Sequence, residues 1–119
     1  MAELIVALDV QTRQEAEEKV KLIGESVGFY KIGLELFIAE GPDVVKAVKG
    51  LGKKVFLDLK LHDIPRTVER AVRSAAKWGA DLTTIHACGG AAMIRAAADA
   101  AAEFDENAPE ILAVTVLTS

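Results

Sequence analysis

The stretch Lys54-Val55-Phe56-Leu57-Asp58-Leu59-Lys60-Leu61 predicts a β-strand with two chemically different faces. Side chains of a strand point alternately to its two faces, so the three leucines share one face and Asp58 and Lys60 share the other. The leucine face suits packing against helices, which leaves the face of Asp58 and Lys60 directed at a polar opening. The stretch therefore favours an α/β fold with a charged strand end.

Strand-like and helix-like segments alternate along the rest of the chain. The apolar runs expected to be strands are Leu4–Val10, Phe29–Gly33, Lys54–Leu61, Leu82–Ala87 and Ile111–Thr118. The helix signals between them are a capping box at Thr12–Glu15, first-turn prolines at Pro42 and Pro65, an alanine-rich helix at Ala91–Glu103, and stops at Gly28, Gly50 and Gly79. The strands start roughly 25–29 residues apart, which is the length of one βα unit.

Two architectures contain consecutive βα units, an open doubly wound sheet and a (β/α)₈ barrel. The turn between Leu8 and Thr12 lacks the Gly-x-Gly-x-x-Gly pattern of a dinucleotide-binding sheet. This absence counts against the open sheet, although both architectures stay open at this point. No linker or low-complexity stretch interrupts the sequence, so we expect residues 1–119 to form a single segment without an internal domain boundary. A complete barrel needs about 200 residues or more, so on the barrel interpretation this chain reaches little more than halfway round.

The composition excludes several classes of protein. The chain is 51% hydrophobic and 27% charged, as in globular domains, and its net charge of -4 argues against binding nucleic acid. No apolar run approaches the roughly 20 residues that span a bilayer, so no membrane segment is expected. The single cysteine, Cys88, cannot form an internal disulfide, which suits a cytoplasmic protein.

Polar residues gather where the predicted strands end. They are Asp9, Lys31, Asp58, Lys60, His86, Thr118 and Ser119. Barrels and open α/β sheets build their active sites at the carboxyl ends of parallel strands, so this edge is the predicted active site.

The pair formed by Asp58 and Lys60 has two interpretations. A structural ion pair is one, although removing two ions from water costs several kcal/mol each. Asp63 adds a third charge after the strand, and an ammonium held between carboxylates can deliver a proton to carbon, which favours catalysis. His86 alone is more typical of a hydrogen-bonded strand end, and His62 is expected to face solvent. No spacing in the sequence predicts a metal site.

At these residues the chain resembles the orotidine 5′-monophosphate decarboxylase family. The matching stretches are Ala7–Val10, Tyr30–Gly33, Phe56–Val68, Thr84–Ala87 and Leu117–Ser119, in the family's order. The most specific of them is Asp58-x-Lys60-x-x-Asp63 followed by Ile64-Pro65-x-Thr67-Val68. The resemblance implies that residues 1–119 form the N-terminal (βα)₄β portion of a TIM (β/α)₈ barrel, the front half of one barrel domain, with parallel strands and outer helices. It also implies a decarboxylase of UMP (pyrimidine) biosynthesis that converts orotidine 5′-monophosphate to uridine 5′-monophosphate without a cofactor.

The resemblance also implies a role for each site residue. Lys31, Asp58, Lys60 and Asp63 match the family's catalytic charge network, in which Lys60 would protonate C6 of the pyrimidine. Substrate binding would involve Asp9, Lys31, Thr67 and Ser119, with Asp9 and Lys31 on the ribose hydroxyls and Ser119 facing the ring. Asp63 and Thr67 would reach into the neighbouring subunit's site, which implies a homodimer with shared active sites.

Two alternatives stay open at this point. The sugar-phosphate decarboxylases and aldolases of the same superfamily share Asp-x-Lys-x-x-Asp but resemble this sequence less after Asp63, and they would need magnesium. A non-catalytic half-barrel that associates with itself is the other. The family's phosphate-binding loops follow later strands than these 119 residues contain, so we expect the chain alone to be inactive.

Overall fold

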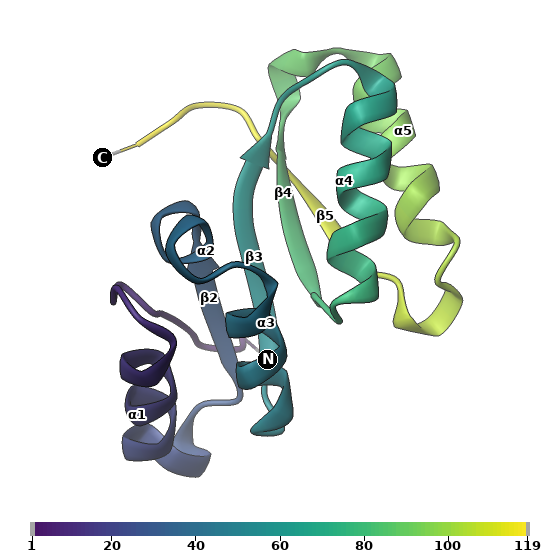
Figure 1. Cartoon of the computed structure of the whole chain (residues 1–119). Coiled ribbons are helices and arrows are strands. Elements are labelled where there is room, and N and C mark those ends of the chain that lie inside the picture. The colour runs from purple at the N-terminus through teal and green to yellow at the C-terminus, as the bar shows by residue number, and fades with distance from the viewer. Residues whose placement is uncertain (1, 119) are drawn as a thin grey trace.

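Five parallel strands form one sheet whose spatial order is the order of the sequence, β1-β2-β3-β4-β5. The structure is a computed structural model that describes residues 2–118 (Figure 1). The strands are β1 (Ile5–Ala7), β2 (Phe29–Gly33), β3 (Lys54–Leu61), β4 (Leu82–His86) and β5 (Glu110–Val114). The helices are α1 (Arg13–Ile23), α2 (Leu34–Glu40), α3 (Pro42–Gly50), α4 (Pro65–Lys77) and α5 (Ala91–Ala102). Each strand pairs with the next one after a helical connection, which is the topology predicted for the first half of a barrel.

The helix boundaries follow local chemistry, and one prediction was wrong. Thr12 Oγ1 accepts a hydrogen bond of 3.1 Å from the N–H of Glu15, as the capping box predicted. Helix α1 ends at Ile23 rather than at Gly28, because Gly24 takes the left-handed backbone (φ 69°) that closes the last turn. Helix α2 was not predicted, since its short apolar run directly continues that of β2.

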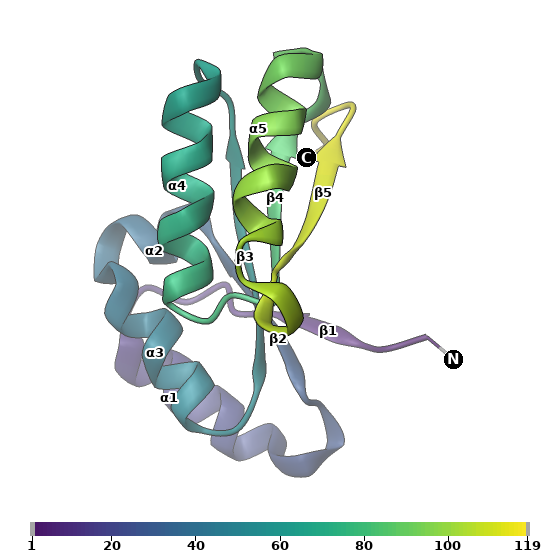
Figure 2. The same cartoon turned by 90° about the vertical axis from the view of Figure 1, so that its right-hand side faces the viewer.

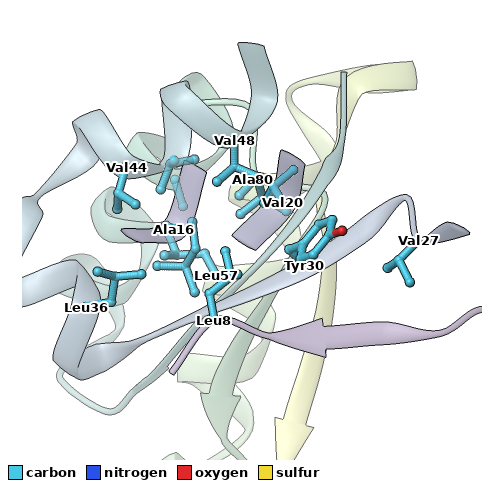
Figure 3. Close-up of a cluster of buried hydrophobic side chains, with 14 residues drawn as sticks. Leu8, Ala16, Val20, Val27, Tyr30, Leu36, Val44, Val48, Leu57 and Ala80 are labelled. Atoms are coloured by element: carbon cyan, nitrogen blue, oxygen red, sulfur yellow. The ribbon is translucent and has the colours of Figure 1, made fainter. Parts of the chain in front are cut away.

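Two apolar clusters hold the elements together. The first joins β1, β2 and β3 to helices α1, α2 and α3, and large side chains such as Leu8, Tyr30 and Leu57 lie fully buried in it (Figure 3). The second lies between β4, α4 and α5 and contains Val68, Val72, Ile85, Met93, Ala97, Ala100 and Ala101. Its alanines let α4 and α5 pack closely side by side (Figure 2). The two clusters fix the strand ends on which the polar residues sit.

Candidate active site

The carboxyl ends of β1 to β4 surround a pocket of about 380 Å³. It is lined by Asp9, Lys31, Gly33, Leu34, Glu35, Asp58, Leu59, Lys60, His86 and Leu117. The predicted site residues lie round one opening, because parallel pairing brings equivalent strand ends to the same edge. Asp9 follows β1, whereas Lys31, Asp58, Lys60 and His86 lie within β2, β3 and β4. The segment that follows β5 crosses this edge, which places Leu117 over the pocket (Figure 1).

Asp58 is the centre of the charges in this pocket. Its Oδ2 lies 2.9 Å from Lys60 Nζ and 3.6 Å from Lys31 Nζ. The side chain is only 8% exposed, so these contacts are poorly screened by water. Burial by itself would raise the pKa of Asp58, but hydrogen bonds from Lys60 and Thr84 and the positive charges of Lys60 and Lys31 outweigh it and lower the pKa. Asp58 is thus an ionised carboxylate between two ammonium groups.

Thr84 is a site residue that the sequence reasoning missed. Its hydroxyl is buried, donates to Asp58 Oδ1 at 2.7 Å and accepts from the backbone N–H of Lys60 at 3.0 Å. One hydroxyl therefore positions both members of the Asp58–Lys60 pair. The available signal was its place two residues before His86 in the same strand, which puts both on the same face of the sheet.

The backbone at Lys60 departs from regular strand geometry. Its φ is 50°, a left-handed value that is uncommon for a residue with a side chain. The pairing of β3 with β4 shifts register between Leu57 and Leu61, as at a β-bulge. Such irregularities re-aim a side chain, and here Lys60 Nζ still reaches Asp58 two residues earlier.

Asp63 does not join this cluster within the chain. Its Oδ1 accepts a hydrogen bond of 2.7 Å from the adjacent N–H of Ile64, and among residues 2–118 it makes no ion pair with Lys60. The expected third charge is missing because the turn after β3 carries Asp63 into solvent. Thr67 is likewise exposed, in the first turn of α4. Ser119 lies outside the described residues.

A second hollow, of about 450 Å³, lies beside the first. Lys31, Asp58, Lys60 and Thr84 contribute to its wall, and the opposite side is made by residues of β5 and the segment after it, including Leu112 and Thr118. Strand β5 ends at Val114, so Thr118 belongs to that following segment rather than to the strand as predicted. The charge cluster therefore borders two hollows.

The hollow at the opposite end of the sheet has a different character. It measures about 410 Å³ and is lined by strand beginnings and charged residues such as Glu3, Lys54 and Asp81. Asp81 is occupied there by structural contacts, since its Oδ2 accepts from Lys49 Nζ and from the N–H of Val55, each at 2.9 Å. Catalytic residues in parallel α/β folds come from the other end, so we place the active site at the carboxyl edge.

Comparison with known proteins assigns the chain to a family. The profile of the "Orotidine 5'-phosphate decarboxylase / HUMPS family" matches residues 2–119. The chain belongs to this family. Its relatives include orotidine 5'-phosphate decarboxylases of Carboxydothermus hydrogenoformans (50% identity over 98% of this chain and 50% of the relative) and of Anaeromyxobacter sp. strain K (53% over 98% and 49%).

Solved structures of the family share the fold. The crystal structure of orotidine 5'-phosphate decarboxylase from Lactobacillus acidophilus superposes with a TM-score of 0.91 at 41% identity, covering 99% of this chain and 55% of that one. The family's structures are TIM barrels, and this chain corresponds to their N-terminal half. It spans about half the length of the curated relatives it matches. The predicted family and fold class are confirmed.

One further property concerns membranes. Within residues 2–118, no helix is both long enough and apolar enough to cross a bilayer. The cytoplasmic location expected from the sequence stays a prediction.

Proposed function

We propose that the full-length protein decarboxylates orotidine 5′-monophosphate to uridine 5′-monophosphate without a cofactor, with Lys60 protonating C6. The observation that carries the proposal is the contact of Lys60 and Lys31 with one buried carboxylate, Asp58, in a member of this family. Relatives about half identical to the chain are named orotidine 5'-phosphate decarboxylase, which supports the same substrate here.

The chemistry needs a fixed positive charge. Loss of carbon dioxide from C6 leaves a carbanion that no ring position can delocalise, so a nearby cation is the available stabiliser. An ammonium at about 4 Å contributes about 4 kcal/mol at an effective dielectric near 20. Lys60 is preorganised for this task because Asp58 holds its Nζ and Thr84 holds its backbone N–H. Lys60 would then donate a proton to C6, which gives uridine 5′-monophosphate.

Asp58 and Lys31 have distinct proposed roles. Asp58 stays ionised because its pKa is lowered, and it would lie beside the departing carboxylate while it orients Lys60. Lys31 would orient Asp58 and, together with Asp9, would hold the ribose hydroxyls from the pocket wall.

We place Asp63 and Thr67 in the active site of a second subunit. Both are exposed, and the neighbouring apolar side chain of Ile64 is 65% exposed, as suits a surface that another chain covers. A homodimer with shared active sites follows from this placement, with one copy supplying Lys60 and the other supplying Asp63.

The test is a decarboxylation assay of the purified full-length protein with and without a metal chelator. We expect turnover of orotidine 5′-monophosphate that survives the chelator. The alternative within the family is a sugar-phosphate decarboxylase or aldolase. Chelator-sensitive turnover of a keto-sugar phosphate, with no action on the nucleotide, would establish that alternative instead.

Residues 1–119 alone should turn over orotidine 5′-monophosphate negligibly. Strands β1 and β5 lie at the two ends of the sheet order, which leaves the charge cluster open to water and the sheet edges free to associate. Light scattering should therefore show self-association, and a separately made C-terminal half should restore turnover. Robust turnover by the fragment alone would overturn the proposed site.

A further inference from the structure

Three potential metal ligands come together beyond the ends of β3 and β4. His62 follows β3 directly, His86 ends β4, and Cys88 lies in the 3₁₀ turn Ala87–Gly89 that follows. One ligand atom from each residue lies within 4.8 Å of the others, and the two imidazole rings are 5.2 Å apart. The chain has two histidines and one cysteine, so all of its imidazole and thiol side chains meet at this point.

The backbone around the cysteine is fixed by the core below it. A Cβ at Gly89 would overlap the sulfur of Met93, which is fully buried in the second apolar cluster. The turn therefore sits directly on the core, with His62 next to it, since that same Cβ would lie 3.5 Å from the His62 ring. Both strand ends are held in place while the three side chains remain exposed or half-buried.

The donor set selects the type of cation. Two imidazole nitrogens and a thiolate suit a borderline-soft ion such as Zn²⁺, whereas Mg²⁺ and Ca²⁺ prefer oxygen ligands. Tetrahedral coordination with zinc–nitrogen bonds near 2.1 Å brings ligand atoms about 3.5 Å apart. The ligand atoms now lie within 4.8 Å of one another, and the side chains of His62 and Cys88 are exposed, which leaves them room to rotate toward that spacing.

We propose that His62, His86 and Cys88 form a binding site for a divalent cation of the Zn²⁺ class, with a fourth coordination position open to water or an added ligand. The site is separate from the charge cluster of the proposed function and does not depend on it. His86 also lines the pocket of Lys60 and Asp58, so a bound cation would stand at the rim of that pocket.

The experiment is a titration of the purified full-length protein with Co²⁺, which reports ligands through its absorption, followed by displacement with Zn²⁺. One equivalent should give a thiolate-to-cobalt charge-transfer band that disappears in Cys88→Ala. His62→Ala and His86→Ala should each weaken binding at least about tenfold, since even indirect partners of a metal ligand commonly contribute that much. Glu35→Gln, in the adjoining pocket, is the matched control and should bind as the parent does.

Alkylation of Cys88 supplies a second readout that does not need the variants to fold. Stoichiometric Zn²⁺ should slow the reaction of Cys88 with iodoacetamide at least tenfold, and Mg²⁺ should not. Cobalt binding that lacks the thiolate band, or that persists in Cys88→Ala, would overturn the site. So would alkylation at the same rate with and without Zn²⁺.

Discussion

Asp58 and Lys60 of the charge cluster and the following turn at Asp63 are close neighbours in sequence, but their side chains are held differently. The cluster is tied together inside the chain by a buried carboxylate and two ammonium groups. The side chain of Asp63 contacts the adjacent backbone and is otherwise directed at solvent. The geometry of the charge cluster is set within its own chain. The exposed side chain of Asp63 is instead free to contact a second chain that binds beside the site.

The largest expected effect comes from removing the ammonium group of Lys60 from the charge cluster. In the full-length protein, Lys60→Ala should abolish decarboxylation while a product-like nucleotide still binds, because ribose and phosphate contacts supply most ground-state binding. Steady-state kinetics and calorimetric titration would measure the two properties. A variant that keeps more than about one-tenth of the turnover, a loss below about 1.4 kcal/mol, would remove Lys60 from the proton-donor role.

The proposed role of the exposed Asp63 in a second subunit's site can be tested by mixing two inactive variants. Full-length Asp63→Ala and Lys60→Ala should recover part of the activity when their subunits exchange, because one site of each mixed dimer then has both residues intact. Recovery would be measured by turnover after unfolding and refolding the mixture. Each variant treated alone is the control, and a mixture that stays inactive despite proven exchange would place Asp63 in its own chain's site.

A smaller effect should follow from removing the hydroxyl that positions Asp58 and Lys60 while both of their charges are kept. Thr84→Val leaves Asp58 Oδ1 and the N–H of Lys60 without the hydroxyl they share, which should destabilise the protein by about 1–3 kcal/mol. It should also lower kcat more than it raises KM, because Lys60 is no longer held in place. Thr84→Ser keeps the hydroxyl and should restore both properties, and equal loss in both variants would indicate simple core disruption.

The smallest expected effect is the pH dependence of stability. The pKa of Asp58 is lower in the folded protein than the unfolded value of about 3.9, so its ion contacts stabilise the fold above that value. This contribution should be complete above about pH 5 and should disappear as the pH falls through the folded pKa. Denaturant unfolding at several pH values should show a steeper acid loss for the parent than for Asp58→Asn. An equal loss of stability with falling pH in the two proteins would contradict the stabilising role of the Asp58 ion contacts.

The sequence predicted the elements better than the contacts between them. Strands β2 and β3 have the predicted bounds. Strands β1 and β5 are shorter than predicted, since apolar character continues past the last backbone pairing. The contacts of Thr84 with Asp58 depend on the register of β4 against β3, and the meeting of His62 with Cys88 depends on a turn packed on the core. Neither is encoded in local spacing.

The left-handed backbone at Lys60 sets two contributions to stability against each other at one position. A residue with a side chain pays about 1–2 kcal/mol for that conformation, whereas glycine adopts it freely. Replacement by glycine would relieve that strain, but it would also remove the ammonium that lies 2.9 Å from the buried carboxylate of Asp58. A library randomised at position 60 and sorted for stability alone would therefore compare the two contributions directly, and enrichment of lysine over glycine would show that the ion pair outweighs the backbone strain.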